Sequence, residues 1–275
     1  MIEESMLLAN NLAAKQIEIT QSRLNRFGIY RNHENLSMKN ENFLKVLINY
    51  ITKSPVQSGS HIKASEINKF LNLYKQLPTT VHNKKQNVIK KRWLKEYGKE
   101  LEELFYNRLK NEIGEFKYDN LKTENGDVIL GLFQESYNPI GLHIDGGFDF
   151  EDLIYKQSLI PLTPVGSTVI FKNRFYGKST NFTIDKKELE KTKLNYGQNI
   201  RSNKHIGMFG NKPFNTEDHK KFLMHEKIDN LLGLEIELVY EWELGSMLIF
   251  DRTNLHCSSS KIEGKKIGLT TFTKK

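Results

Sequence analysis

The spacing of apolar residues along the chain changes at about residue 120. Before that point apolar side chains recur every three or four positions, as along one face of a helix. This pattern predicts helices over 42–51, from about Ser65 to the residues before Pro78, and over 86–113. Ser65 is a candidate N-cap for the second of these. The apolar stripe of the third should pack against a sheet rather than bind a cofactor.

After residue 120 the pattern is that of short strands separated by turns, beginning with a turn at Asn125-Gly126. Short strands with Gly and Pro turns are typical of jelly rolls. The predicted fold is therefore α+β. A double-stranded β-helix (a jelly-roll or cupin-like barrel) forms the core at 121–275, with the insertion described next, and a mostly helical support region at 1–120 packs on it. The predicted strands are 128–133, 158–162, 167–171, 235–240, 246–250 and 267–272.

Residues 173–232 interrupt the strand pattern. They form a polar stretch rich in Asn and Lys, followed by a predicted short helix at about 216–232. An excursion of this length within a compact domain is often a lid or a substrate loop, so we interpret it as an insertion over the barrel mouth. His219 and His225 fall on the predicted helix and are expected at the surface rather than among metal ligands.

Composition limits the class of protein. The chain has 275 residues, of which 38% are hydrophobic, and this is enough to bury a core. No apolar run is long enough to span a membrane, and the acidic start at 1–5 is unlike a signal peptide. The single cysteine, Cys257, excludes an internal disulfide framework and fits a cytoplasmic location. The net charge of +8 comes from scattered lysines, and even the densest cluster, 84–92, is expected on a solvated helix face.

Three residues suggest a metal site. His143 and Asp145 are two positions apart, so their side chains share one face of an extended strand. His256 follows the predicted strand 246–250. Two histidines and one carboxylate are the ligands of non-haem Fe(II) oxygenases, in which the remaining coordination positions stay open. The competing interpretation, that these are structural histidines, is weakened by Asp145 and by the downstream pattern.

At these positions the chain resembles the Fe(II)/2-oxoglutarate-dependent dioxygenase superfamily, nearest to its prolyl-4-hydroxylase-like branch. The resemblance rests on several motifs in order and covers roughly residues 125–275, with the insertion at 173–232 as a departure. The motifs are His143 with Asp145, the strand 166–171, the strand 245–250, His256 and the turn 264–266.

The resemblance implies that His143, Asp145 and His256 hold Fe(II) and that Lys266 binds the far carboxylate of 2-oxoglutarate. Tyr137 is a further candidate contact to this co-substrate. Lys265, which faces the opposite side of the strand, and Lys156 are alternatives to Lys266. The list of cofactors is Fe(II), 2-oxoglutarate and O₂, with ascorbate as a candidate reductant.

The implied reaction is hydroxylation of an unactivated C–H bond in an amino acid, a peptidyl residue or a small metabolite, with release of succinate and CO₂. Related halogenases place a small residue where Asp145 stands, so its carboxylate favours hydroxylation or desaturation. The substrate cannot be inferred from the sequence, although Arg174 and Arg201 are candidate contacts for an acidic group. Oligomeric state is equally open.

Two other classes of function compete with this one. The first is a cupin-like barrel that binds a metal or a sugar without catalysis. The second is a nucleic-acid demethylase, suggested by the positive charge. Demethylases of this superfamily use arginines after the second histidine, and none follows His256. Nucleic acid is therefore a disfavoured partner, and Cys257 should point away from the metal into the packing of the barrel.

Overall fold

The structure is a computed structural model, and the residues it describes belong to one compact unit within 56–275. The helix predicted at 42–51, the turn at Asn125-Gly126 and Arg201 lie outside these residues. Three short strands are described by their backbone alone, at 57–59, 180–183 and 199–200. The other described residues are 62–83, 87–119, 127–145, 154–175 and 210–275.

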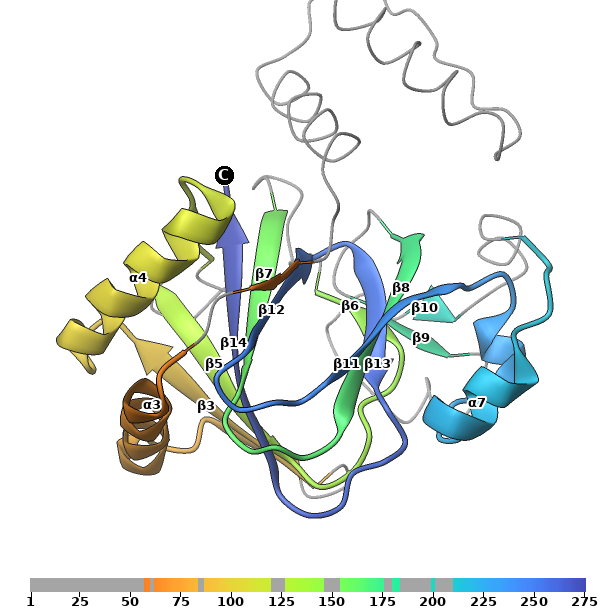
Figure 1. The fold of residues 1–275 in the computed structure, drawn as a ribbon, viewed down its shortest axis with the longest axis horizontal. Helices are drawn as coiled ribbons and strands as arrows, with labels where there is room; N and C mark the ends of the chain where they lie inside the picture. Colours follow the sequence, from red (N-terminus) through yellow and green to blue (C-terminus); the bar gives the residue numbers. More distant parts are fainter. Residues whose placement is uncertain are drawn as a thin grey trace, which may run out of the picture. The chain divides into compact units, whose positions relative to one another are not determined.

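Two sheets, almost entirely antiparallel, face each other (Figure 1). The larger sheet has eight strands, with β4 (Lys117–Tyr118) paired to β14 outside the main path. Its other strands run in the order β1 (Gln57–Gly59), β12 (Met247–Asp251), β7 (Ile154–Pro161), β14 (Lys266–Lys274), β5 (Ile129–Ser136), β3 (Val88–Leu94) and β2 (Val81–Asn83).

The smaller sheet has six strands and carries both histidines of interest. Its order is β10 (Asn199–Ile200), β9 (Thr180–Thr183), β6 (His143–Ile144), β13 (Asn254–Ser258), β8 (Ser167–Arg174) and β11 (Ile236–Glu241). The strands predicted from 128 onward all correspond to strands in the two sheets. The pattern did not predict β13, which contains His256, because it follows β12 after only two residues.

Helices α3 (Ala64–Gln76) and α4 (Lys99–Ile113) cover the outer face of the larger sheet (Figure 1). Phe70 of α3 and Phe105 of α4 pack on Trp93 of β3, with ring centroids 5.8 Å from Trp93 in both pairs. Helix α3 ends before Pro78, as predicted. The prediction of Ser65 as its cap is wrong, because the cap is Lys63, whose backbone N–H donates to the Glu66 carboxylate at 2.9 Å.

The prediction of one helix over 86–113 is wrong in its first half. Residues 88–94 form β3, which pairs with β5, and the helix starts only after Gly98, whose φ of +63° suits glycine. Four-residue spacing between Trp93 and Tyr97 mimicked a helical stripe. The described part of the 84–92 cluster therefore lies on a strand, and the Lys91 ammonium donates to the backbone carbonyl of Tyr74.

Within the insertion, β9 and β10 extend the smaller sheet, and the segment 210–232 packs on the outer face of that sheet. It contains α7 (Thr216–Phe222) and the 3₁₀ helix η1 (Ile228–Leu231) instead of one helix over 216–232. Leu223 and Leu231 are fully buried in a cluster with Phe171 and Cys257. Cys257 thus packs away from the interior, as predicted. The role of the insertion as a lid stays a prediction for its remaining residues.

A separate apolar cluster fills the space between the two sheets. It contains Leu159, Ile170, Leu248 and Phe250, with Trp242 packed against them. This cluster links the two ends of the candidate site described below. None of the helices that the structure describes combines the length and the apolar character needed to cross a bilayer.

Candidate metal centre

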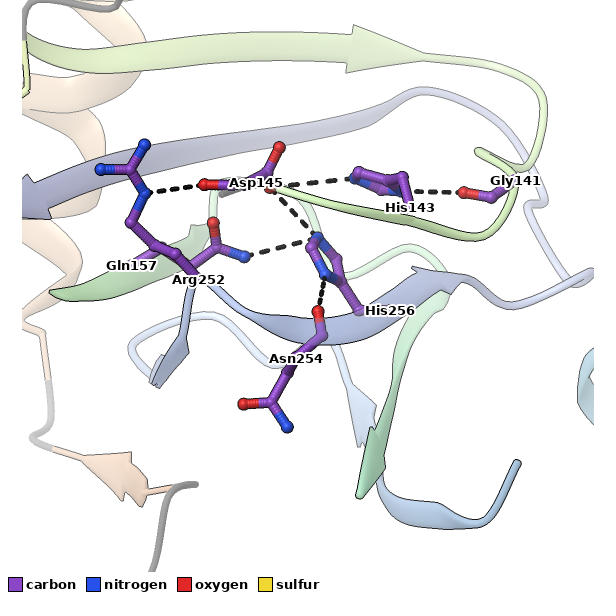
Figure 2. A network of polar contacts seen from close by, with 7 residues as sticks. All are labelled: Gly141, His143, Asp145, Gln157, Arg252, Asn254 and His256. Atoms are coloured by element: carbon purple, nitrogen blue, oxygen red, sulfur yellow. Dashed lines mark hydrogen bonds and ion pairs between the residues drawn. The ribbon is translucent and has the colours of Figure 1, made fainter. Parts of the chain in front are cut away.

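Pairing between β6 and β13 brings His143 directly opposite His256, and Asp145 follows β6 immediately (Figure 2). Each of the three residues offers one ligand atom, and these atoms all lie within 4.8 Å of one another. The distance between the Asp145 carboxylate and the His256 Nε2 is 3.1 Å, and that to the His143 Nε2 is 3.8 Å. The three residues predicted from the sequence therefore converge in space.

Backbone carbonyls orient both imidazoles. The Nδ1 of His143 lies 2.8 Å from the carbonyl oxygen of Gly141, and the Nδ1 of His256 lies 2.9 Å from that of Asn254. Each Nδ1 must carry the proton to donate to its carbonyl, so each Nε2 presents a lone pair towards Asp145. Two lone pairs and a carboxylate then face one another, and a cation between them would satisfy all three. Histidine ligands in metal sites are oriented in this way.

The surroundings of His143 and Asp145 set the charge of each group. Burial lowers the pKa of His143 to about 4, helped by the neighbouring His256 ring, so the imidazole is neutral at pH 7. Burial alone would raise the pKa of Asp145. The close contact with His256, the neighbouring His143 ring and the Arg252 guanidinium outweigh this effect, and the pKa of Asp145 lies well below its usual range. A neutral imidazole and an ionised carboxylate are the forms that bind metal.

Two residues beside the triad were missed by the sequence analysis. The Gln157 amide nitrogen, on β7, lies 3.3 Å from the Nε2 of His256, and Gln157 is 1% exposed. Its amide oxygen is buried without a hydrogen bond among the residues that the structure describes. Arg252, at the turn between β12 and β13, donates from Nε to the backbone carbonyl of Asp145 at 2.8 Å. No local pattern marks either residue, because their partners are about a hundred positions away.

Lys90 on β3 places a positive charge on the side of the metal centre. Burial lowers the pKa of its ammonium, and attraction to Asp145 partly offsets this effect. Lys90 also contributes to the lowered pKa of His143. The sequence analysis assigned it to a solvated helix face, and the structure instead places it, half-buried, on a strand.

Lys266 is the only one of the three candidate lysines that is buried. It is 2% exposed, its ammonium donates to the carbonyl of Ser167 at 2.8 Å, and it lies 4.1 Å from the centre of the Trp242 ring. Gly268 makes room for that ring, because a Cβ there would lie 2.6 Å from the indole. Burial lowers the pKa of Lys266 to about 7. Among the carboxylates in the described part of the chain, none forms an ion pair with it.

The alternative lysines are engaged elsewhere. The Lys265 ammonium forms an ion pair with Glu135 at 2.7 Å, and that of Lys156 pairs with Asp251 at 2.7 Å. Tyr137 is 37% exposed and donates its hydroxyl to the same Glu135 at 2.6 Å. Glu135 also binds Tyr74 of α3, so the Tyr137 hydroxyl belongs to the cluster of Tyr74 and Lys265 around this carboxylate.

Lys266 and the triad border the same apolar cluster between the sheets. Phe250 of that cluster stacks edge-on against the His256 ring, with centroids 4.9 Å apart, while Trp242 covers Lys266. The Trp242 indole donates to the hydroxyl of Thr168 at 2.9 Å. The space between the sheets therefore has metal ligands at one end and a buried cation at the other.

The insertion supports the segment that leads to His143. The carboxylate of Glu226 accepts hydrogen bonds from the backbone N–H of Leu142 at 2.5 Å and from the side-chain amide of Asn230 at 3.0 Å. On the other side, the N–H of Ser258 donates to the carbonyl of Ile140 at 3.0 Å. The loop that carries the first histidine is thus held from both sides.

The triad does not include His219 and His225, which were expected at the surface, or Arg174, a candidate substrate contact. His219 and His225 are half-buried and contact the Glu226 carbonyl and the Ser260 hydroxyl. Neither joins the triad, although burial lowers the pKa of His225 to about 4. Arg174 forms an ion pair with Asp251 at 2.5 Å.

No protein-family model matches the chain, and no curated protein matches it. Among solved structures it is similar to HygX from Streptomyces hygroscopicus with nickel and 2-oxoglutarate bound, at 12% identity and a TM-score of 0.43 over 87% of each chain. It is also similar to a Pseudomonas putida prolyl-4-hydroxylase, at 9% identity and a TM-score of 0.39 over 84% of this chain and 97% of that one.

A further similar structure is an oxidoreductase of the 2OG-Fe(II) oxygenase family from Burkholderia pseudomallei. The identity is 9% and the TM-score 0.41, over 91% of this chain and 95% of that one.

Proposed function

We propose that this protein is an Fe(II)- and 2-oxoglutarate-dependent oxygenase that hydroxylates an unactivated C–H bond, with release of succinate and CO₂. One observation carries the proposal: the Nε2 lone pairs of His143 and His256 and the carboxylate of Asp145 converge, with both Nδ1 atoms engaged by backbone carbonyls. Two imidazoles and one carboxylate fit Fe(II) and leave the other coordination positions open for a co-substrate and O₂.

Lys266 is the proposed partner for the far carboxylate of 2-oxoglutarate. It is the buried lysine of the three candidates, and it borders the same apolar cluster as His256. A charge-assisted hydrogen bond in such surroundings is stronger than one exposed to water. In the protein without 2-oxoglutarate, the Ser167 carbonyl and the Trp242 ring hold the ammonium in place.

When bound, iron and 2-oxoglutarate supply the chemistry that activates O₂ and oxidises the substrate C–H bond. The task of the protein is to hold and orient. Asp145 supplies the negative charge, and the two imidazoles supply neutral lone pairs. Leu159, Leu248 and Phe250 keep water from the space between the triad and Lys266. The proposed substrate is an amino acid, a peptidyl residue or a small metabolite. Ascorbate is the proposed reductant that keeps iron in the Fe(II) state.

The test is succinate formation with Fe(II), 2-oxoglutarate and ascorbate, followed by a mass-spectrometric screen of metabolites and peptides for a product heavier by one oxygen atom. His143→Ala and Asp145→Ala are expected to abolish both signals while the circular dichroism spectrum stays the same. His82→Ala is the matched control, since this exposed histidine lies on the edge strand β2 of the larger sheet. Succinate formation that persists in both triad variants contradicts the proposal.

An anaerobic titration separates this function from a metal-binding barrel without catalysis. An oxygenase of this type would bind 2-oxoglutarate only after the metal, because the metal would supply part of the co-substrate's binding site. We expect no 2-oxoglutarate binding by the apoprotein and clear binding after Mn(II) is added. Metal binding without any affinity for 2-oxoglutarate favours the non-catalytic barrel.

A further inference from the structure

Arg252 holds the backbone of Asp145 from both sides. The Nε of Arg252 donates to the carbonyl oxygen of Asp145 at 2.8 Å, and the N–H of Asp145 donates to the carbonyl oxygen of Arg252 at 3.2 Å. Figure 2 shows the guanidinium beside the Asp145 carbonyl, on the side away from the two imidazoles. Asp145 lies just past the two residues of β6, so no ladder hydrogen bond in the described residues fixes it.

Two of the three nitrogens of the Arg252 guanidinium form hydrogen bonds, and Nη2 is buried without a partner among the described residues. The Nη1 of Arg252 donates to the carboxylate of Asp119 at 2.6 Å and to the carbonyl oxygen of Thr273 at 3.0 Å. Arg252 is 0% exposed and Asp119 is 8% exposed, so this ion pair is buried. The Asp119 backbone N–H is bonded in turn to the carbonyl of Phe272 at 3.0 Å. Arg252 therefore ties Asp145 to the rigid end of β14.

The charges also matter for a metal site. The Arg252 guanidinium is a buried positive charge directly beside the backbone of Asp145. An uncompensated cation at that position would repel a divalent metal ion a few ångströms further on. The carboxylate of Asp119 cancels this charge at 2.6 Å. Arg252 alone would orient Asp145 but weaken metal binding by charge repulsion. The Arg252–Asp119 pair orients Asp145 without adding a net positive charge near the metal.

We propose that Arg252 and Asp119 form a buried ion pair that positions Asp145 for metal binding, Arg252 by fixing its backbone and Asp119 by neutralising Arg252. Neither residue contacts the metal ligand atoms, so both are positioning residues. This inference rests on the proposed metal site. It assigns the orientation of the carboxylate ligand to Arg252, between β12 and β13, and to its two partners, Asp119 and the backbone carbonyl of Thr273 on β14.

The experiment measures Co(II) affinity and the Co(II) visible spectrum anaerobically, without 2-oxoglutarate, together with thermal unfolding. Arg252→Gln keeps one hydrogen-bonding amide but loses the positive charge and the planar arrangement of donors in the guanidinium. We expect it to weaken Co(II) binding about 10- to 100-fold, the usual effect of removing an outer-shell partner, and to change the spectrum. Arg252→Lys should recover part of the affinity, since it keeps the charge but cannot reach both partners in the planar geometry of arginine.

Asp119→Asn tests the electrostatic half of the proposal. The amide can still accept a hydrogen bond from Arg252, so the Co(II) spectrum should stay close to that of the wild type while the affinity falls about tenfold. Arg108→Gln is the matched control. It breaks an arginine–carboxylate pair with Glu66 at 2.9 Å between α4 and α3, remote from the metal centre. It should lower thermal stability and leave the Co(II) affinity and spectrum unchanged.

Equal Co(II) affinity and spectrum in Arg252→Gln and the wild type overturn the proposal. Unfolding of all three variants of Arg252 and Asp119 does so as well, since the pair would then act on general stability. Failure of the proposed function gives a different result. The wild type then binds no Co(II), or His143→Ala binds Co(II) as well as the wild type does, whatever the Arg252 variants show.

Discussion

Titration of Lys266 should make 2-oxoglutarate binding depend on pH. Burial lowers the pKa of its ammonium to about 7, and the proposed carboxylate partner binds only the charged form. Below pH 7 the ammonium is present in the free protein. Above pH 7 it is increasingly neutral, and binding must take up a proton. The dissociation constant should therefore rise by up to about tenfold per pH unit, or about 1.4 kcal/mol, and be about 100-fold larger at pH 9 than near pH 6.5.

The assay is anaerobic calorimetry of 2-oxoglutarate with the Mn(II)-loaded protein, at several pH values and in two buffers of different ionisation enthalpy. At pH 8 the buffer dependence should reveal the uptake of about one proton. Lys266→Met, which matches the side chain in length, should bind about 10- to 100-fold more weakly at pH 6.5, the loss of a hydrogen bond to a charged group, and show no slope. Lys265→Met is the control, because that ammonium pairs with Glu135 and should not affect binding.

The same lysine gives a check without any ligand. Its folded pKa of about 7 lies below the ordinary value of 10.5, so between these values the unfolded chain binds more protons than the folded one. The free energy of unfolding of the wild type should therefore gain a contribution that rises with pH from 7 to 10.5, and Lys266→Met should lack it. Wild-type 2-oxoglutarate affinity that is constant from pH 6.5 to 9, or an equal slope in Lys266→Met, refutes the reasoning.

Two further predictions concern the metal centre. In the metal-free protein the His143 ring should titrate near pH 4 by NMR, since burial opposes its charge, and a midpoint near 6.5 would show that the ring is solvated. Gln157→Leu removes the amide beside His256 and should weaken 2-oxoglutarate binding by about 1 kcal/mol, or roughly fivefold, with Co(II) affinity within about twofold of the wild type. A large loss of Co(II) affinity would instead assign Gln157 to holding the histidine.

The three converging residues were predictable because each lies in a strand context that the sequence displays. His143 and Asp145 share a face through their spacing, and His256 follows a buried strand that begins at a glycine turn. The pairing of β6 with β13, which sets the distance between the imidazoles, has no counterpart in a local pattern. The sequence therefore predicted which residues meet, and the structure was needed for how they are oriented.

The errors have a common physical cause. Strand β3 was predicted as helix because its sequence lacks a regular alternation of apolar and polar residues. In the structure Trp93 packs under α3 and α4 and Lys91 lies along Tyr74, so an apolar and a charged side chain both face the helices. Arg252 and Asp119 were missed because they pair across 133 positions. Tertiary contacts of this kind override local propensity and cannot be inferred from periodicity.

The grip of Glu226 on Leu142 limits how this protein can be re-engineered. Variable loops are commonly exchanged between homologous enzymes to change substrate preference, and the insertion at 173–232 is the segment that such an exchange would use. Here, however, the Glu226 carboxylate accepts a hydrogen bond from the backbone of Leu142, next to His143. Replacing the whole insertion would therefore remove a contact that positions a proposed iron ligand. Chimaeras should therefore replace only the part of the insertion before residue 210, so that the recipient keeps its own Glu226.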